Sequence, residues 1–197
     1  MKTEPLPRSA SGPAGGGPAP GRRSYAFEQV SEFLSGFTGG QVVDLGGAFQ
    51  STIDYVTGLG HRLYAEDVLD SLAPLPAGAA LPQDCLDFPP ASVDVMLCWD
   101  RLQFLPEDLS FPLLERIHRI MAPSGLLLAL FHPEQSSSAP PLACRVADPR
   151  HLLIAARGAP RPLRPFSTRM IERFFQRFES LRFYLTRENL QEVIVRR

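Results

Sequence analysis

Lysine and cysteine are both scarce in this sequence of 197 residues. Lys2 is the sole lysine, so arginine carries almost all of the positive charge. The three cysteines, Cys85, Cys98 and Cys144, form no C-x-x-C pair, which argues against a disulfide framework and against a structural zinc. The four histidines lack the spacing of metal ligands. We therefore expect no metal site and a protein of the reducing cytoplasm.

Long hydrophobic runs are missing as well. No apolar run approaches the roughly 18 residues of a membrane helix, and the first residues lack the apolar core of a secretory signal. A net charge of −1 gives no global reason to expect nucleic acid or an anionic membrane as a partner. The charge is uneven, however, because 12 arginines and 5 acidic residues lie from residue 144 onwards. That excess indicates either a coding bias or a basic binding face.

Two kinds of segment divide the chain. Residues 1–23 consist largely of Pro, Gly, Ala and Ser, a composition that predicts a disordered tail. Residues 24–197 are long enough for a single domain, and the 44% of hydrophobic residues is enough for a real core. Within this domain, residues 132–166 are rich in Pro, Ser and Arg, and we expect them to form an irregular insert.

Strand and helix patterns alternate through the domain. We expect strands at 42–45, 62–65, 93–98 and 126–131, and helices at 24–36, 51–57, 113–121 and 167–178. Residues 69–82 predict little more than one helical turn. Two short strands at 181–185 and 193–195 are close enough in sequence to form an antiparallel hairpin. This alternation predicts an α/β fold, a three-layer Rossmann-like sandwich around a mostly parallel sheet.

The first strand ends in a turn with small residues, at the edge where such sheets bind ligands. The residues at this place are Asp44, Leu45, Gly46, Gly47 and Ala48. Small side chains allow a ligand to approach the backbone, and free N–H groups bind anionic or polar groups. The alternative is a tight connection without a ligand, and the turn does not fit the G-x-G-x-x-G pattern of dinucleotide sites.

Acidic and aromatic residues lie next to the other strands. Glu66 and Asp67 follow the second strand, where an acid commonly accepts hydrogen bonds from ribose hydroxyls; the alternative is a helix cap. Asp84 and Cys85 precede the third strand and are suited to contact an adenine amino group and ring, unless Asp84 is a solvated loop acid. Trp99 follows that strand, and it either stacks on a ligand or covers the sheet edge.

Three stretches together resemble the motifs of the class I S-adenosylmethionine-dependent methyltransferases, in particular their type 11-like domain. Asp44-Leu45-Gly46-Gly47 is similar to the first motif, D-x-G-x-G-x-G. Residues 84–96 resemble the next motif, an acid before an apolar-Pro turn and a strand. Residues 113–128 resemble the helix, Pro-Gly turn and strand that come after it. The likeness covers about residues 25–131.

The resemblance implies a seven-stranded sheet of order 3-2-1-4-5-7-6 that ends in the antiparallel hairpin. It also implies S-adenosylmethionine as cofactor and a small-molecule acceptor. The sulfonium methyl is already activated, so the protein needs only to align a nucleophile and exclude water. By position, the resemblance assigns Asp44 and Gly46–Gly47 to the methionine part, Asp67 or Glu66 to the ribose, and Asp84 with Cys85 to the adenine.

Two positions depart from the family motif. Ala48 stands where the second glycine is usual, and Gln50 stands where the third is. Ala48 is small, whereas Gln50 or its neighbour Phe49 is large enough to plug a pocket. No residue is identified as a general base, although His132 and Asp100 follow strands at the mouth of the crevice.

Three functions therefore stay open from the sequence. Acids at all three cofactor positions favour a methyltransferase, whereas the altered glycine turn favours a catalytically inactive binding or regulatory module of the same fold. A nicotinamide-dependent oxidoreductase is disfavoured by the missing third glycine. The insert contributes arginines that either meet an anionic acceptor or partner or form a solvated surface: Arg145, Arg150, Arg157, Arg161 and Arg164.

Overall fold

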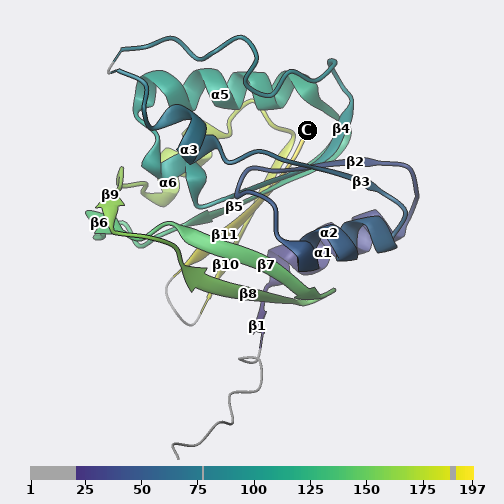
Figure 1. The fold of residues 1–197 in the computed structure, drawn as a ribbon. Helices are drawn as coiled ribbons and strands as arrows, with labels where there is room; N and C mark the ends of the chain where they lie inside the picture. The colour runs from purple at the N-terminus through teal and green to yellow at the C-terminus, as the bar shows by residue number, and fades with distance from the viewer. Residues whose placement is uncertain (1–20, 77, 187–189) are drawn as a thin grey trace, which may run out of the picture.

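A mixed sheet of six strands forms the centre of the computed structural model, which describes residues 21–76, 78–186 and 190–197. The strand order is β10-β11-β5-β4-β2-β3 (Figure 1). Strands β2, β3, β4 and β5 run parallel, and β11 is antiparallel to both of its neighbours. The bounds are β2 Gln41–Asp44, β3 Arg62–Ala65, β4 Val93–Trp99, β5 Met121–Phe131, β10 Ser180–Leu185 and β11 Gln191–Arg196. The predicted α/β fold with a C-terminal hairpin is confirmed.

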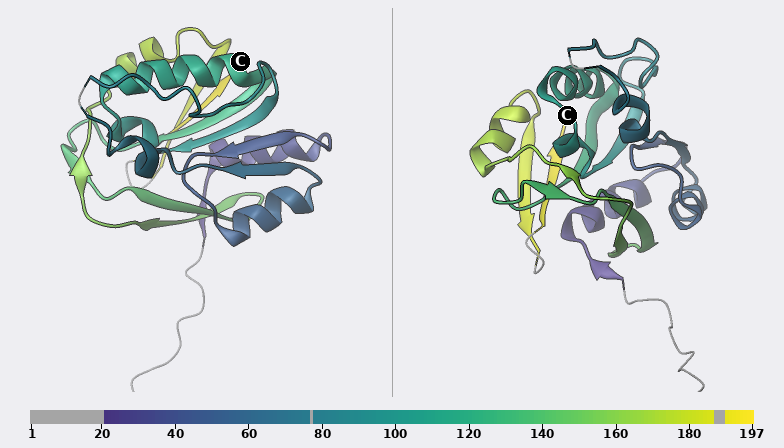
Figure 2. Two further views of the ribbon diagram at one scale, coloured as in Figure 1. Left: turned by 45° about the horizontal axis from the view of Figure 1, so that its top comes forward. Right: turned by 60° about the vertical axis from the view of Figure 1, so that its left-hand side comes forward.

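Helices cover both faces of this sheet, and two hydrophobic cores result (Figures 1 and 2). Because side chains alternate along a strand, Val43 and Met96 pack into one core while Val42 and Val95 pack into the other. The first core contacts α3 Val68–Leu72, α4 Arg101–Phe104, α5 Glu107–Ile120 and α6 Thr168–Phe174. The second contacts α1 Tyr25–Ser35 and α2 Gln50–Gly58.

The predicted seventh strand is not found in the described part of the chain. Residues 78–92 contain turns and no strand, so β3 ends the sheet on that side. Pro82, Pro89 and Pro90 lie in this segment, and proline lacks the N–H that a strand would donate to its neighbour. The prediction of seven strands was therefore wrong by one edge strand, and the order of the remaining six agrees with it.

The expected irregular insert, residues 132–166, is wrong in part. It contains β7 Leu142–Asp148 and β8 His151–Ala156, which pair as an antiparallel hairpin, and the short strands β6 Ser138–Ala139 and β9 Arg161–Pro162. Leu142, Cys144 and Val146 on β7 are buried in the second core, beside exposed Arg145. That alternation is a strand signal, obscured in sequence by the flanking prolines and arginines.

The boundaries of three other elements shift. Arg22 and Arg23 form β1, which pairs with β8, although the predicted tail extends to residue 23. The rest of that tail, residues 1–20, lies outside the described residues. Helix α5 begins at Glu107 rather than 113, after Pro106, with Pro112 inside its first turns. Strand β5 begins at Met121, where the helix was expected to end.

Candidate functional site

Asp44 ends β2 and organises the glycine turn that follows. Its Oδ1 atom accepts hydrogen bonds from the Gly46 N–H at 2.8 Å and from the Trp99 indole N–H at 2.6 Å. The side chain is fully buried, and its Oδ2 atom has no hydrogen-bond partner among the described residues. Burial raises the pKa of Asp44 to about 6, against the opposing effect of the two N–H donors.

Trp99 covers the turn. A Cβ atom placed on Gly46 would lie 2.6 Å from Cδ1 of the indole, so only glycine fits beneath the ring. The indole is fully buried, and the backbone of Trp99 has a positive φ of 49°, which is uncommon for a residue with a side chain. The sequence predicts that Trp99 either stacks on a ligand or covers the sheet edge. In the structure, its ring packs on the backbone of Gly46 and donates a hydrogen bond to Asp44.

Asp67 faces the same turn from the end of β3. It caps α3 by accepting from the N–H groups of Leu69 and Asp70 through Oδ1. Its other oxygen, Oδ2, lies 3.5 Å from where a Cβ on Gly47 would be. Gly47 itself has a φ of 94°, a conformation that glycine adopts without strain. Both predicted roles of Asp67 therefore stay compatible, because one oxygen caps the helix and the other points at the turn.

Arg157 occupies the space in front of Asp67. It lies just after β8, and its Nη1 atom donates to Asp67 Oδ2 and, at 3.4 Å, to the Gly46 carbonyl. Its Nη2 atom donates to Asp70 Oδ2 at 3.2 Å. The Arg157 side chain is 43% exposed. No sequence pattern singles out this arginine from the other four in the insert.

Arg101 fills the floor of the crevice. It is 1% exposed and forms an ion pair with its neighbour Asp100 at 2.7 Å. It also donates to the Gly46 carbonyl at 3.2 Å. The cavity that is left between Asp67, Arg101, Pro141, Arg157 and Arg161 has a volume of about 100 Å³. Ligand pockets usually have about 300–1,000 Å³, so the crevice is closed in this conformation.

Gln50 and Phe49, which are large enough to plug the pocket, both lie elsewhere. Gln50 is exposed and donates to Asp54 at 2.7 Å. The Phe49 ring lies under the Arg145 guanidinium, 4.9 Å from its centroid. Ala48 is exposed at the end of the turn. Protein atoms do fill the crevice, but they come from Trp99 and Arg157 rather than from the glycine loop.

Glu66, Asp84 and Cys85 form a second group beside the first. Burial raises the pKa of Glu66, which accepts from the Leu86 N–H and the Cys85 thiol, and the charge of Asp84 raises it further. Arg116 on α5 donates to the carbonyl oxygens of Pro82, Gln83 and Cys85. Asp84 itself is exposed. The predicted adenine residues are thus gathered at one place.

His132 and Asp100, which were noted at the mouth of the crevice, contact each other. The His132 Nε2 atom lies 3.1 Å from Asp100 Oδ2, and the Leu142 N–H donates to the same oxygen at 2.9 Å. The His132 side chain is 11% exposed. Asp100 therefore connects β4 to the insert and leaves no free oxygen for a ligand.

Metal and membrane features are missing from the part of the chain that the structure describes. No group of three or more His, Cys, Asp or Glu residues in it is arranged to hold a metal ion. None of its helices combines the length and the apolar character required to span a bilayer.

Comparison with known proteins identifies the fold. No family profile matches the sequence, and no curated protein does. Among solved structures, an S-adenosylmethionine-dependent methyltransferase from Mesorhizobium loti is similar over 88% of this chain and 99% of its own, with 12% identity and a TM-score of 0.51. DhpI in complex with SAH is similar over 87% of this chain and 81% of its own, with 15% identity and a TM-score of 0.52. The chain therefore has the fold of the class I S-adenosylmethionine-dependent methyltransferases, in agreement with its sequence motifs.

Proposed function

We propose that the chain binds S-adenosylmethionine at the carboxyl edge of its parallel strands and transfers the methyl group to a small-molecule acceptor. The observation that carries this proposal is the position of Asp67 relative to Gly47. An acidic oxygen that faces a glycine turn at this edge of the sheet is the arrangement that accepts two ribose hydroxyls. Among the residues that the structure describes, its partner is Arg157, whose side chain is 43% exposed.

The ribose part fits these residues once Arg157 leaves. A surface ion pair contributes about 0–1 kcal/mol. Arg157 is 43% exposed but Asp67 only 17%, so we take the upper end, about 1 kcal/mol, as the cost of moving Arg157 into solvent. Arg157 precedes Gly158, whose φ of 77° marks a turn, and its side chain reaches the crevice from the end of the hairpin. The adenine would lie toward Glu66, Asp84 and Cys85.

The methionine part would lie at Asp44, Leu45, Gly46, Gly47 and Ala48. Asp44 holds the Gly46 N–H and fixes the shape of this turn. Once bound, the cofactor supplies an activated methyl group. The protein's contribution would be to position both partners and exclude water.

Trp99 is the feature that does not fit the cofactor. Its indole lies on Gly46, where the methionine part would approach, and it is held by a buried hydrogen bond. This observation favours a second candidate function, a catalytically inactive module that keeps the fold. The two candidates differ in whether the cofactor binds.

Isothermal titration calorimetry with S-adenosylhomocysteine tests the proposal on the wild type, Arg157→Ala and Asp67→Asn. We expect Arg157→Ala to bind about fivefold more tightly, the equivalent of about 1 kcal/mol, and Asp67→Asn to bind far more weakly. Arg150→Ala is the matched control, because Arg150 lies on the same hairpin and pairs with Glu28 of α1, away from the crevice. If neither the wild type nor Arg157→Ala releases heat at millimolar ligand, the inactive module is the correct function.

A further inference from the structure

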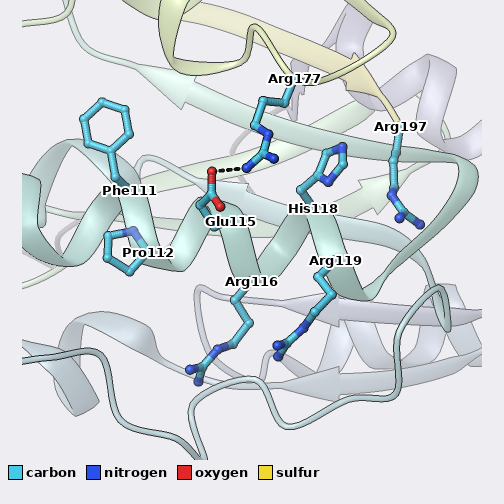
Figure 3. A pocket seen from close by; sticks show the side chains of 8 residues that line it. All are labelled: Phe111, Pro112, Glu115, Arg116, His118, Arg119, Arg177 and Arg197. Carbon is cyan, nitrogen blue, oxygen red and sulfur yellow. Dashed lines mark hydrogen bonds and ion pairs between the residues drawn. The ribbon is translucent and has the colours of Figure 1, made fainter.

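A second hollow lies away from the crevice, along the outer side of α5. Its volume is about 760 Å³ (Figure 3). The Arg197 backbone N–H donates to the Gly125 carbonyl in the first half of β5. The hollow therefore ends near the amino ends of the parallel strands, whereas Asp67 lies at their carboxyl ends. Of the described residues that line it, Arg116 alone also contacts the proposed cofactor site, through the Cys85 carbonyl.

Basic side chains dominate the hollow. Arg116, His118 and Arg119 come from α5, Arg177 follows α6, and Arg197 follows β11. One acid, Glu115, lies among them. Burial and the charges of Arg197 and Arg177 lower the pKa of His118, so this histidine already experiences positive potential from two directions. An anion in the hollow would relieve that repulsion.

Two of the arginines are anchored to the backbone and keep donors free. The Arg116 Nη1 atom donates hydrogen bonds to three backbone carbonyl oxygens in the loop before β4. The Arg197 Nη1 atom donates to the Met121 carbonyl. A guanidinium has five N–H donors, so each retains N–H groups while its side chain is held in place. Anchoring reduces the side-chain entropy that binding costs.

Two more arginines of the hollow can form ion pairs with a bound acidic group. Arg119 is exposed, and among the described residues no hydrogen bond or ion pair engages its guanidinium. Arg177 pairs with Glu115, but both side chains are about 60% exposed, at 62% and 58%. Such a pair is worth about 0–1 kcal/mol, so Arg177 exchanges readily to another carboxylate.

The shape favours an extended partner rather than a small ion. Phe111, 39% exposed, begins the hollow, and Arg119 lies eight residues further along the helix, a rise of about 12 Å at 1.5 Å per residue. The geometry points to a docking surface for an acidic segment of another protein, with an apolar residue of that segment against Phe111. Nucleic acid is less suited, since its binding typically uses about 6–10 phosphate contacts, whereas Phe111 and Glu115 interrupt the basic lining here.

Fluorescence anisotropy tests this surface with a labelled decapeptide of Asp and Glu that carries one Leu near its end. The wild type should bind it in a salt-dependent manner, and Arg119→Glu should weaken binding at least about tenfold, the equivalent of about 1.4 kcal/mol. Arg62→Glu is the matched control, because Arg62 is exposed on β3 at the far edge of the sheet. Circular dichroism melting verifies that both variants fold.

Four outcomes would overturn the inference. They are no binding of the peptide by the wild type, equal weakening by Arg119→Glu and Arg62→Glu, tighter binding of a single-stranded oligonucleotide of the same charge, and a dimer in sedimentation that Arg119→Glu dissociates. The last would make the occupant a second copy of the chain. None of these results depends on whether the crevice binds S-adenosylhomocysteine.

Discussion

Trp99 and Asp44 form a buried hydrogen bond of 2.6 Å between the ends of two neighbouring parallel strands. Within the described residues, the indole N–H is one of two donors to this carboxylate, which has no contact with solvent. This bond joins the two strand ends and fixes the glycine turn beneath the ring. It holds the indole over the crevice floor, and it partly opposes the rise in the pKa of Asp44 that burial causes.

Trp99→Phe removes this donor while retaining an aromatic ring. We expect the free energy of unfolding to fall by about 1–3 kcal/mol, because a buried acceptor loses a partner. Urea unfolding followed by far-ultraviolet circular dichroism measures the change. Tyr64→Phe, at a side chain that is 40% exposed, should change the stability little. Equal effects of the two substitutions would contradict the bond's contribution.

Gly46→Ala and Gly58→Ala form a matched pair. The first places a methyl group 2.6 Å from the indole, whereas the second meets no atom within 4 Å. We expect Gly46→Ala to destabilise by about 1–3 kcal/mol through overpacking, and Gly58→Ala, at the end of α2, to be neutral or slightly stabilising. Trp99 is the single tryptophan, so only Gly46→Ala should shift the emission maximum.

Asp44 should make stability depend on pH. Its pKa is about 6 in the folded protein and 3.8 in the unfolded chain, so between these values the folded state binds more protons. The free energy of unfolding therefore rises as the pH falls from about 6 to about 4, by at most about 3 kcal/mol at 1.4 kcal/mol per pKa unit.

Asp44→Asn should remove that share of the pH dependence, because the amide oxygen still accepts both hydrogen bonds but does not titrate. Urea unfolding at pH 4.5 and pH 7 measures the difference for the wild type and the variant. Asp87→Asn, at an exposed loop position, is the control. An unchanged slope in Asp44→Asn would assign the effect to other carboxyl groups, such as Glu66 and Glu192, whose pKa values burial also raises.

Asp100→Ala leaves Arg101 as a buried charge without its ion pair. We expect a loss of about 3–5 kcal/mol in the free energy of unfolding. The double variant Asp100→Ala/Arg101→Met also removes the buried, unpaired charge of Arg101, so it should recover part of the lost free energy of unfolding. Thermal and urea unfolding of the three proteins test this. A double variant no more stable than the single one would show that Asp100 acts mainly through Leu142 and His132.

The sequence was sufficient to predict the fold class and that Asp44, Gly46 and Asp67 would lie at one edge of the sheet. The strands at 42–45 and 93–98 were predictable because their residues are mostly apolar and bounded by turns, and the strand at 62–65 because it follows a helix and a glycine. These strands bring the three residues together. The filling of the crevice was not predictable. It depends on Arg157 reaching back across 90 residues to Asp67, and on the rotamer of Trp99, neither of which follows from local patterns.

Without a seventh strand, β3 is an edge strand of the sheet, and this edge is its margin. A long, flat margin would invite another chain to add to it, with the risk of aggregation. Here the margin is only four residues long, begins with a charged arginine, Arg62, and has Tyr64 packed edge-on against Phe88 of the proline-rich segment. The shortened sheet thus ends in a form that discourages strand addition, so the loss of one strand need not make the protein prone to self-association.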